Sequence, residues 1–216
     1  MEDILQTIVA HKRREVALHI AHTSLETMRA RAEAVDRPTV SMSRALKASS
    51  TGIIAEFKRR SPSKGWISRY AHPSDVAAAY ERSGAAAISI LTDGEFFGGG
   101  VSDLTAARAV TTLPLLRKEF IVHEYQIYEA RAVGADAVLL IASVLTPEEC
   151  RHLTDTAHAL GLETLLEIHS ADEIGHILPD TDMIGVNNRH LGTFHTDTEV
   201  SFTMADKLPH DRVLVS

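Results

Sequence analysis

An acid and a base stand side by side where the first predicted strand ends. The apolar run 53–55 reads as a buried strand, and Glu56 and Lys58 follow it. Because side chains alternate along a strand, Glu56 and Lys58 lie on the same face. Opposed charges at the carboxyl end of a buried strand are costly for folding alone. We therefore interpret the pair, with the polar turn 61–65 that follows, as part of a functional site.

Further polar side chains follow later apolar runs. Lys118 follows the apolar run that begins at 113, and Glu167 lies near the end of the run 164–168. Asn187 and Arg189 lie at the end of the run that begins at 183. Taken alone, Lys118 is more often a solvated loop lysine, and 187–189 is more often a plain turn. If these strand ends converge, a partly desolvated lysine near other cations has a lowered pKa and donates protons better near neutrality. Two carboxylates and two lysines in one mouth suit acid-base chemistry.

The elements that must position these residues alternate along most of the chain. The first 50 residues read as helical, with an apolar stripe from Ile4 to Lys12, a helix capped by Ser24 and a short one over 43–47. Helices are also predicted over 74–82, 103–110 and 124–133, and two capping boxes begin at Thr146 and Ser170. Apolar strands are predicted over 53–57, 87–91, 113–117, 137–141, 164–168, 183–187 and 213–216.

Strands buried on both faces and separated by single helices indicate a parallel sheet with right-handed crossovers. Either an open doubly wound sheet or an eight-stranded barrel fits this order. Polar residues end nearly all the strands, which favours a barrel, because closure brings every strand end to one mouth. No Gly-x-Gly-x-x-Gly fingerprint follows the first strand. We expect one α/β domain over 1–216, a (β/α)8 TIM barrel with residues 1–50 as a helical N-terminal extension.

Composition narrows the function classes. The 216 residues carry a formal net charge of -7, which argues against a nucleic-acid partner. The chain lacks a signal-peptide hydrophobic segment and a run long enough to span a membrane. The single cysteine, Cys150, suits a reducing cytosol and is expected to be a buried helix residue. We expect a cytoplasmic protein without membrane or nucleic-acid partners, either a monomer or a weak homodimer.

Two other features invite a function and are interpreted as ordinary structure. Gly98-Gly99-Gly100 lacks the Gly-Lys-Ser/Thr continuation of a phosphate loop and reads as a flexible connection. The twelve histidines form no His-Glu-x-x-His motif, so a solvated or packed role is preferred and no metal is expected. The scattered histidines include His72, His123, His169, His190 and His195.

The chain resembles the indole-3-glycerol-phosphate synthase family of tryptophan biosynthesis over essentially its whole length. The resemblance rests on the stretch 53–66, on Leu115-Leu116-Arg117-Lys118-Glu119-Phe120-Ile121-Val122, on Glu167-Ile168 and on Gly185-Val186-Asn187-Asn188-Arg189. It implies a carboxy-lyase that closes the indole ring of 1-(2-carboxyphenylamino)-1-deoxyribulose 5-phosphate, with loss of carbon dioxide and water. It implies a small phosphorylated substrate and no cofactor. Glu119 stands where many relatives carry aspartate.

The resemblance also implies roles for the charged residues. Lys118 would be the general acid that protonates the substrate carbonyl, and Glu167 and Glu56 would be acid-base residues. Lys58 and Arg189 would bind the anthranilate carboxylate, with Lys58 also assisting proton transfer. Which glutamate serves at which step stays open.

Substrate-binding roles are implied for uncharged residues. Asn187 would hydrogen-bond a sugar hydroxyl, and Ser61 and Pro62 would belong to a first loop at the phosphate side that closes over the mouth. The anthranilate ring would lie between Phe97, Phe120 and Leu139, although each alone is more often a core residue.

Seven strand starts are present and the eighth is absent, so we expect a barrel that is incomplete at its C-terminal side. Two alternatives to the synthase therefore stay open. One is an inactive truncated barrel fragment that lacks most of the phosphate cradle and keeps residual ligand binding. The other is a related phosphate-binding barrel isomerase, which would need an acid-base pair such as a cysteine and an aspartate. Cys150, on a predicted helix, does not suit that role.

Overall fold

A parallel sheet in chain order forms the centre of the computed structural model, which describes residues 4–189 and 196–216. A doubly wound sheet reverses its strand order at a switch point, and no reversal occurs in the described part. The sheet curves as an open, incomplete barrel whose edge strands are the first and the last, as expected. Its strands are β1 (Ile54–Phe57), β4 (Ala87–Leu91), β5 (Leu115–Lys118), β6 (Ala137–Ile141), β7 (Glu163–Ile168), β8 (Met183–Val186) and β9 (Val213–Val215).

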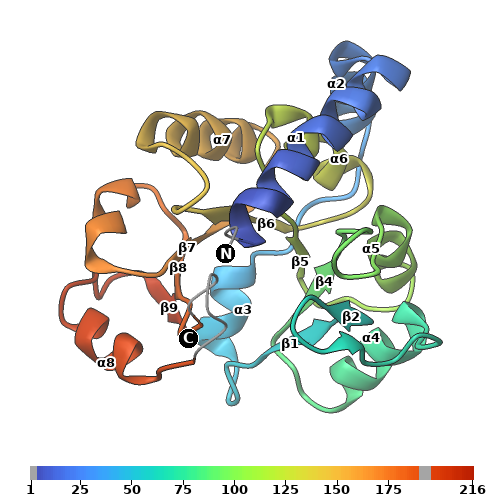
Figure 1. Cartoon of the computed structure of the whole chain (residues 1–216). Helices are drawn as coiled ribbons and strands as arrows, with labels where there is room; N and C mark the ends of the chain where they lie inside the picture. Colours follow the sequence, from blue (N-terminus) through green and yellow to red (C-terminus); the bar gives the residue numbers. More distant parts are fainter. Residues whose placement is uncertain (1–3, 190–195) are drawn as a thin grey trace.

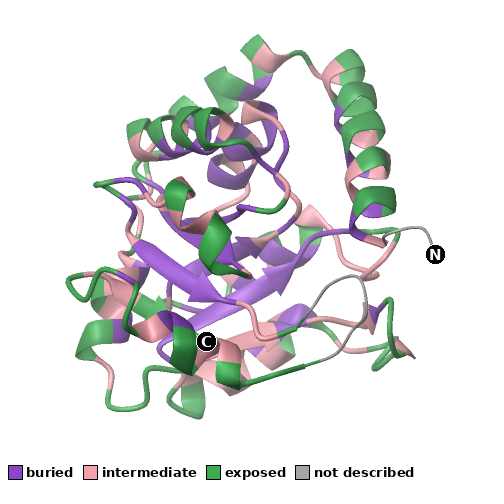
Figure 2. Cartoon of the chain, turned by 60° about the vertical axis from the view of Figure 1, so that its left-hand side comes forward, coloured by how far each residue is buried: buried purple, intermediate pink, exposed green. Residues whose placement is uncertain are grey.

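Helices cover the outside of this sheet, and Figure 1 shows the strands curving around a common centre with these helices around them. Buried strands and helices with exposed outer faces are visible in Figure 2. The short hairpin β2 (Arg60–Ser61) and β3 (Gly65–Trp66) lies between β1 and the first outer helix. The outer elements are α4 (Pro73–Arg82), α5 (Val101–Arg108), α6 (Glu124–Ala132), α7 (Pro147–Ala159), the 3-10 helix η1 (Ala171–His176) and α8 (Glu199–Ala205).

The predicted capping boxes had different outcomes. Thr146 and Glu149 form the expected reciprocal pair at the start of α7. The prediction at Ser170 was wrong, because its side chain makes no capping hydrogen bond and the segment is a 3-10 helix. Glu173 instead accepts a 2.6 Å hydrogen bond from the backbone N–H of His169, one residue before the expected cap.

Two apolar layers hold the sheet together. The outer layer packs strand residues such as Ile88, Ile90 and Leu140 against the surrounding helices. The inner layer, inside the curve of the sheet, contains Leu116 and Leu139. Three helices precede the sheet along the chain, namely α1 (Ile4–His22), α2 (Leu25–Glu33) and α3 (Met42–Ala48). Within the described residues, no helix is long and apolar enough to cross a membrane.

The end of the barrel where the strands begin is closed by α3. Met42 and Leu46 of this helix are buried in the inner apolar layer. Ser41 and Ser43 donate side-chain hydrogen bonds of 2.5 and 2.7 Å to Glu163, the first residue of β7. The inner layer therefore has a floor at the amino ends of the strands and opens at their carboxyl ends.

A buried ammonium group fastens α1 to the other end of the barrel. The side chain of Lys12 is 1% exposed, and its Nζ lies 3.0 Å from Asp93 Oδ2 and 3.1 Å from Glu119 Oε1. Asp93 and Glu119 follow β4 and β5, and Glu15 of α1 adds a third carboxylate at 3.1 Å. Burial alone would lower the pKa of Lys12, but the charges of Glu119 and Asp93 raise it above its ordinary value. Lys12 is thus a permanent cation.

Replacing Lys12 with methionine is expected to destabilise the protein by about 3–5 kcal/mol, because it removes the cation that lies between the buried carboxylates of Asp93 and Glu119. Urea unfolding would measure this change. Arg13→Met is the matched control, since Arg13 is half-exposed and makes only a 3.9 Å contact with Glu149, so its effect should stay within about 0.5 kcal/mol. A loss below about 1 kcal/mol for Lys12→Met would show that the network is not needed for folding.

Candidate active site

One cavity of about 520 Å³ opens at the carboxyl ends of the strands. Residues from all of the parallel strands line it, together with Ile4, Leu5 and Ile8 of α1. The register sets neighbouring strand ends side by side, for instance Glu56 opposite Ser89. Every site residue predicted from the sequence lines this cavity, namely Glu56, Lys58, Ser61, Pro62, Phe97, Lys118, Phe120, Leu139, Glu167, Asn187 and Arg189.

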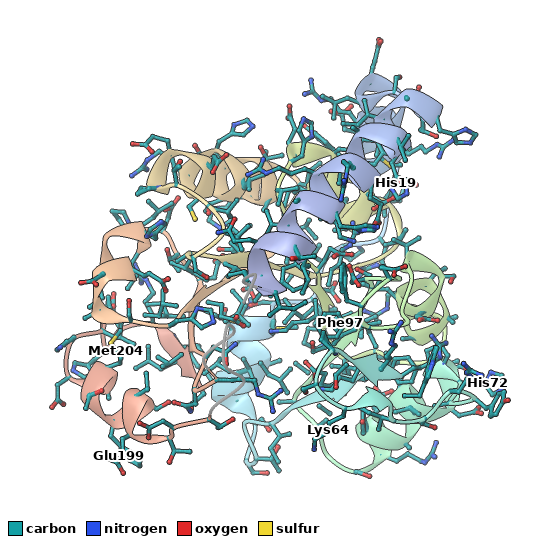
Figure 3. All side chains as sticks on the ribbon, in the orientation of Figure 1. His19, Lys64, His72, Phe97, Glu199 and Met204 are labelled. Carbon is teal, nitrogen blue, oxygen red and sulfur yellow. The ribbon has the colours of Figure 1, made fainter. Side chains whose placement is uncertain are left out.

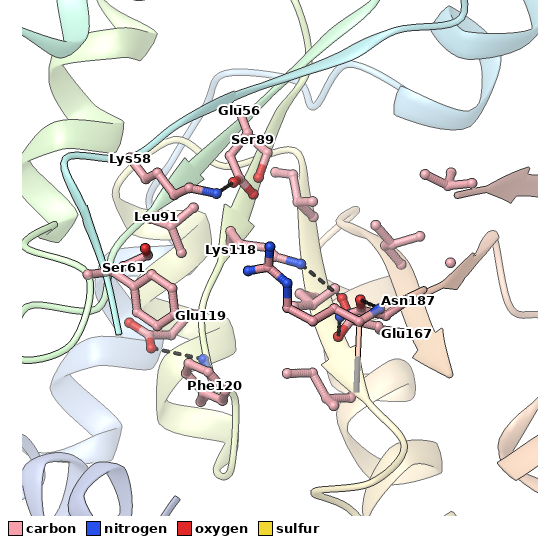
Figure 4. A pocket seen from close by; sticks show the side chains of 18 of the residues that line it. Glu56, Lys58, Ser61, Ser89, Leu91, Lys118, Glu119, Phe120, Glu167 and Asn187 are labelled. Atoms are coloured by element: carbon pink, nitrogen blue, oxygen red, sulfur yellow. Dashed lines mark hydrogen bonds and ion pairs between the residues drawn. The ribbon is translucent and has the colours of Figure 1, made fainter. Parts of the chain in front are cut away.

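An ion pair crosses the cavity between two strands that are not neighbours. Lys118 Nζ, at the end of β5, donates a 2.9 Å hydrogen bond to Glu167 Oε2 on β7. Asn187, directly after β8, donates a 3.0 Å hydrogen bond from Nδ2 to the other oxygen of Glu167. Figure 4 shows these three side chains pointing toward one another. Glu167 therefore has a partner on each carboxylate oxygen.

The expectation that Lys118 has a lowered pKa was wrong for the free protein. Burial does act in that direction, but the adjacent charge of Glu167 and its hydrogen bond raise the pKa of Lys118 above its ordinary value. The charges that act on the pKa of Lys118 are those of the carboxylates Glu167 and Glu56, not those of the cations that the sequence suggested. Burial would raise the pKa of Glu167, yet Lys118 and the Asn187 hydrogen bond hold it below its usual range. Lys118 is therefore charged and Glu167 ionised while the two are paired.

A second acid-base pair lies on β1 and just beyond it. Lys58 Nζ donates a 2.5 Å hydrogen bond to Glu56 Oε1, as strand alternation predicted. Both side chains are about one-third exposed, so this pair is more open to solvent than Lys118 and Glu167. Figure 4 shows the pair beside Ser89 on the neighbouring strand. The cavity thus contains two separate acid-base pairs.

Apolar side chains form the walls between the charged pairs. The rings of Phe97 and Phe120 lie 6.0 Å apart between centroids, and Leu139 of β6 adds an aliphatic surface. Asp93 Oδ1 accepts hydrogen bonds from the backbone N–H groups of Phe96 and Phe97, which fixes the loop that carries the first ring. These walls are suited to a flat aromatic group.

The loop that carries Phe97 is closely packed, whereas the sequence suggested a flexible connection. A Cβ added to Gly99 would lie 2.1 Å from the carbonyl oxygen of Leu91, so only glycine fits there. The N–H of Gly99 donates a 2.8 Å hydrogen bond to the carbonyl of Asp93. The glycines at this position therefore allow close backbone contact.

The remaining predicted residues occupy the turns around the mouth. Ser61 is buried in β2 and its Oγ accepts a hydrogen bond from the N–H of Lys64, which shapes the turn that also contains Pro62. The side-chain oxygen of Asn187 accepts a 2.9 Å hydrogen bond from the N–H of Arg189. Asn187 therefore belongs to a turn, as its residue type suggested, and also contacts Glu167.

Sequence reasoning missed other residues of the cavity. Ser89 lines it, and its buried hydroxyl has no hydrogen-bond partner within residues 4–189 and 196–216. The signal was a serine within an otherwise apolar strand, two residues before Leu91. Glu119 also lines the cavity and accepts a 2.9 Å hydrogen bond from the N–H of Phe120.

Other reactive groups lie away from the cavity or form no cluster. The Cys150 thiol is buried in α7, where burial and the nearby Glu149 raise its pKa to about 12. It cannot serve as an acid-base group near neutrality. His72 is exposed at the edge of the molecule (Figure 3), while His190 and His195 lie outside the described residues. In the part of the chain that the structure describes, no three ligating side chains form a metal site.

The fold and the cavity define an α/β-barrel enzyme with acid-base pairs at the carboxyl ends of its strands. The indole-3-glycerol phosphate synthase family model matches residues 5–216. The chain is 54% identical over 216 residues to the indole-3-glycerol phosphate synthase of Bacteroides thetaiotaomicron, covering all of this chain and 83% of the relative. It is 46% identical over 219 residues to that of Burkholderia cenocepacia, covering 84% of the relative. The chain belongs to the indole-3-glycerol phosphate synthase family, carboxy-lyases of tryptophan biosynthesis.

Replacing Glu167 with glutamine is expected to lower the pKa of Lys118, because the charge that raises it disappears while burial remains. Nuclear magnetic resonance titration of lysine side chains would follow the change. Glu163→Gln is the control, since Glu163 lies at the other end of the same strand and pairs with Ser41 and Ser43. A Lys118 pKa that stays in place in Glu167→Gln would show that the pair is not electrostatically coupled.

Proposed function

We propose that this chain converts 1-(2-carboxyphenylamino)-1-deoxyribulose 5-phosphate into indole-3-glycerol phosphate with the residues that line the cavity. The Lys118–Glu167 ion pair carries the proposal. It sets a charged acid and an ionised base 2.9 Å apart, within a cavity whose walls suit an aromatic ring. The family to which the chain belongs supports this chemistry.

In the proposed first step, Lys118 protonates the substrate ketone while the ring carbon that bears the carboxylate attacks it. The new carbon-carbon bond forms, and the carboxylate then leaves as carbon dioxide, which restores aromaticity. Glu167 or Glu56 assists the loss of water that completes the indole ring. Lys118 must leave Glu167 to reach the ketone, so substrate binding and activation of the acid are linked. Folding the flexible substrate so that its two carbons meet is a large part of the catalysis.

Binding is assigned to the surrounding residues. Lys58 and Arg189 hold the anthranilate carboxylate, for which a guanidinium fork and an ammonium group are both suited. Phe97, Phe120 and Leu139 enclose the ring. Asn187 hydrogen-bonds a sugar hydroxyl, with the loop that contains Ser61 and Pro62 at the phosphate side. All of these side chains line the one cavity, which supports their shared role.

We also propose that residues 1–216 act as a single domain in the cytoplasm, as a monomer or a weak homodimer. The N-terminal helices support one domain, since Lys12 of α1 and Met42 of α3 are both buried against the sheet. The free, buried thiol of Cys150 supports a reducing compartment. Sedimentation at several concentrations would test the oligomeric state.

Lys118→Ala is expected to lower kcat by about a hundredfold to ten-thousandfold, the usual contribution of a positioned general acid. Turnover is measured by the appearance of indole-3-glycerol phosphate, and circular dichroism checks that the variant folds. Lys47→Ala, at an exposed position of α3, is the control and should keep full activity. Near-normal turnover in folded Lys118→Ala would exclude Lys118 as the acid.

A further inference from the structure

His169 lies next to Glu167 but is not one of the residues that line the cavity. It follows β7, two residues after Glu167, and its side chain is 16% exposed. Both ring nitrogens are buried and neither has a hydrogen-bond partner within the described residues. Buried polar atoms are almost always hydrogen-bonded, so an imidazole whose two ring nitrogens make no ordinary hydrogen bond requires an explanation.

Two carboxylates stand on opposite sides of this imidazole. Nε2 lies 3.5 Å from Glu167 Oε1, and Nδ1 lies 3.7 Å from Glu173 Oε2. Glu173 is fixed in place, because the same oxygen accepts the backbone N–H of His169 at 2.6 Å. His176, on the same 3-10 helix as Glu173, points toward backbone carbonyl groups instead. Its Nδ1 lies 3.1 Å from the backbone oxygen of Glu173, and its Nε2 lies 2.9 Å from that of Leu145.

Only the protonated form of an imidazole can donate a hydrogen bond to both carboxylates. A neutral ring has one N–H and one lone pair, so one nitrogen would face a carboxylate acceptor with no proton between them. A protonated ring has two N–H groups and can donate to both carboxylates. Each distance exceeds an ordinary hydrogen bond by less than 1 Å, so a small movement of Glu167 or of the ring would complete the contacts.

The proposed reaction supplies a reason for that movement. Glu167 is buried, and Lys118 compensates its charge at 2.9 Å. When Lys118 turns to the substrate and gives up its proton, this compensation is lost. Asn187 still donates a hydrogen bond to Glu167, but a buried carboxylate without a compensating cation is costly, so a second cation next to it would stabilise this stage of the reaction.

We propose that His169 is a positioning residue that holds the Glu167 carboxylate after Lys118 has transferred its proton to the substrate. Its imidazolium donates Nε2–H to Glu167 and Nδ1–H to Glu173, and Glu173 thereby orients the ring. Glu167 passes from a pair with Lys118 to a pair with His169 while staying at the dehydration site. The inference rests on the roles proposed above for Lys118 and Glu167.

Two substitutions at His169 test the proposal. His169→Leu removes both donors and is expected to lower kcat about tenfold, comparable to the loss of one hydrogen bond to a charged group. His169→Gln keeps one donor near Glu167 but no charge, and about a threefold loss is expected. KM should change by less than about twofold in both, because His169 does not touch the cavity. A loss that appears mainly in KM would overturn the proposal.

A double-mutant cycle with Glu173 separates positioning from general loosening of the structure. Glu173→Gln keeps an oxygen for the backbone N–H of His169 but removes the charge that orients the ring. It is expected to lower kcat about threefold alone and to have no further effect in the His169→Leu background. Equal losses in both backgrounds would show that the two residues act independently, which would overturn the proposal. If His169→Leu fails to fold, His169→Gln and Glu173→Gln form the same cycle.

Two further variants complete the design. His158→Gln is the matched control, because His158 bonds Asp182 at 2.8 Å near the amino end of β8, and its kcat should be unchanged. Glu167→Gln tests the proposed function itself. If Glu167→Gln keeps full turnover, the assigned role of Glu167 fails. If it abolishes turnover while kcat of folded His169→Leu stays within twofold of the original, only the inference about His169 fails.

Discussion

The open end of this barrel depends on the ion pairs that the ammonium group of Lys12 forms with two buried carboxylates. Asp93 and Glu119 follow neighbouring strands and are buried, so without a cation between them their charges would oppose the folded state. That cation comes from α1, which is thereby fixed across the strand ends. Leu5 and Ile8 of the same helix then line the cavity. One buried charge therefore links the N-terminal helix to the loops that carry Phe97 and Phe120.

The cavity contains two ion pairs of a lysine with a glutamate. Lys118 is neutralised by Glu167, and Lys58 by Glu56, so the free protein carries no isolated ion in either pair. This arrangement keeps Lys118 protonated and Glu167 ionised, as the directions of their pKa values show. In the proposed mechanism, the carboxylate and the ketone of the substrate offer each lysine a new partner. Binding would then separate the pairs, and Lys118 would become a stronger acid only when it leaves Glu167.

Local pattern was enough to predict the strands and the acid-base pair at the end of the first of them, whereas the uncharged residues of the cavity lining were predicted from the family resemblance. Strand alternation placed Glu56 beside Lys58, and apolar runs located the strands to within about two residues. The pKa of Lys118 was predicted in the wrong direction, since its neighbour across the cavity is 49 positions away in the chain. The burial of Lys12 also depends on contacts between distant elements, because its partners Asp93 and Glu119 follow β4 and β5. No local pattern contains that information.

The two ends of the strands show how the chain separates stability from chemistry. At the amino ends, the buried Asp136 accepts hydrogen bonds from Arg37, Arg108 and two backbone N–H groups, so its oxygens are well satisfied. At the carboxyl ends, the Ser89 hydroxyl and the His169 ring nitrogens are buried without partners in the described structure. Unsatisfied groups weaken a fold, and these two residues lie where a ligand or a moving side chain can complete their hydrogen bonds. The carboxyl ends of barrel strands are where active sites form.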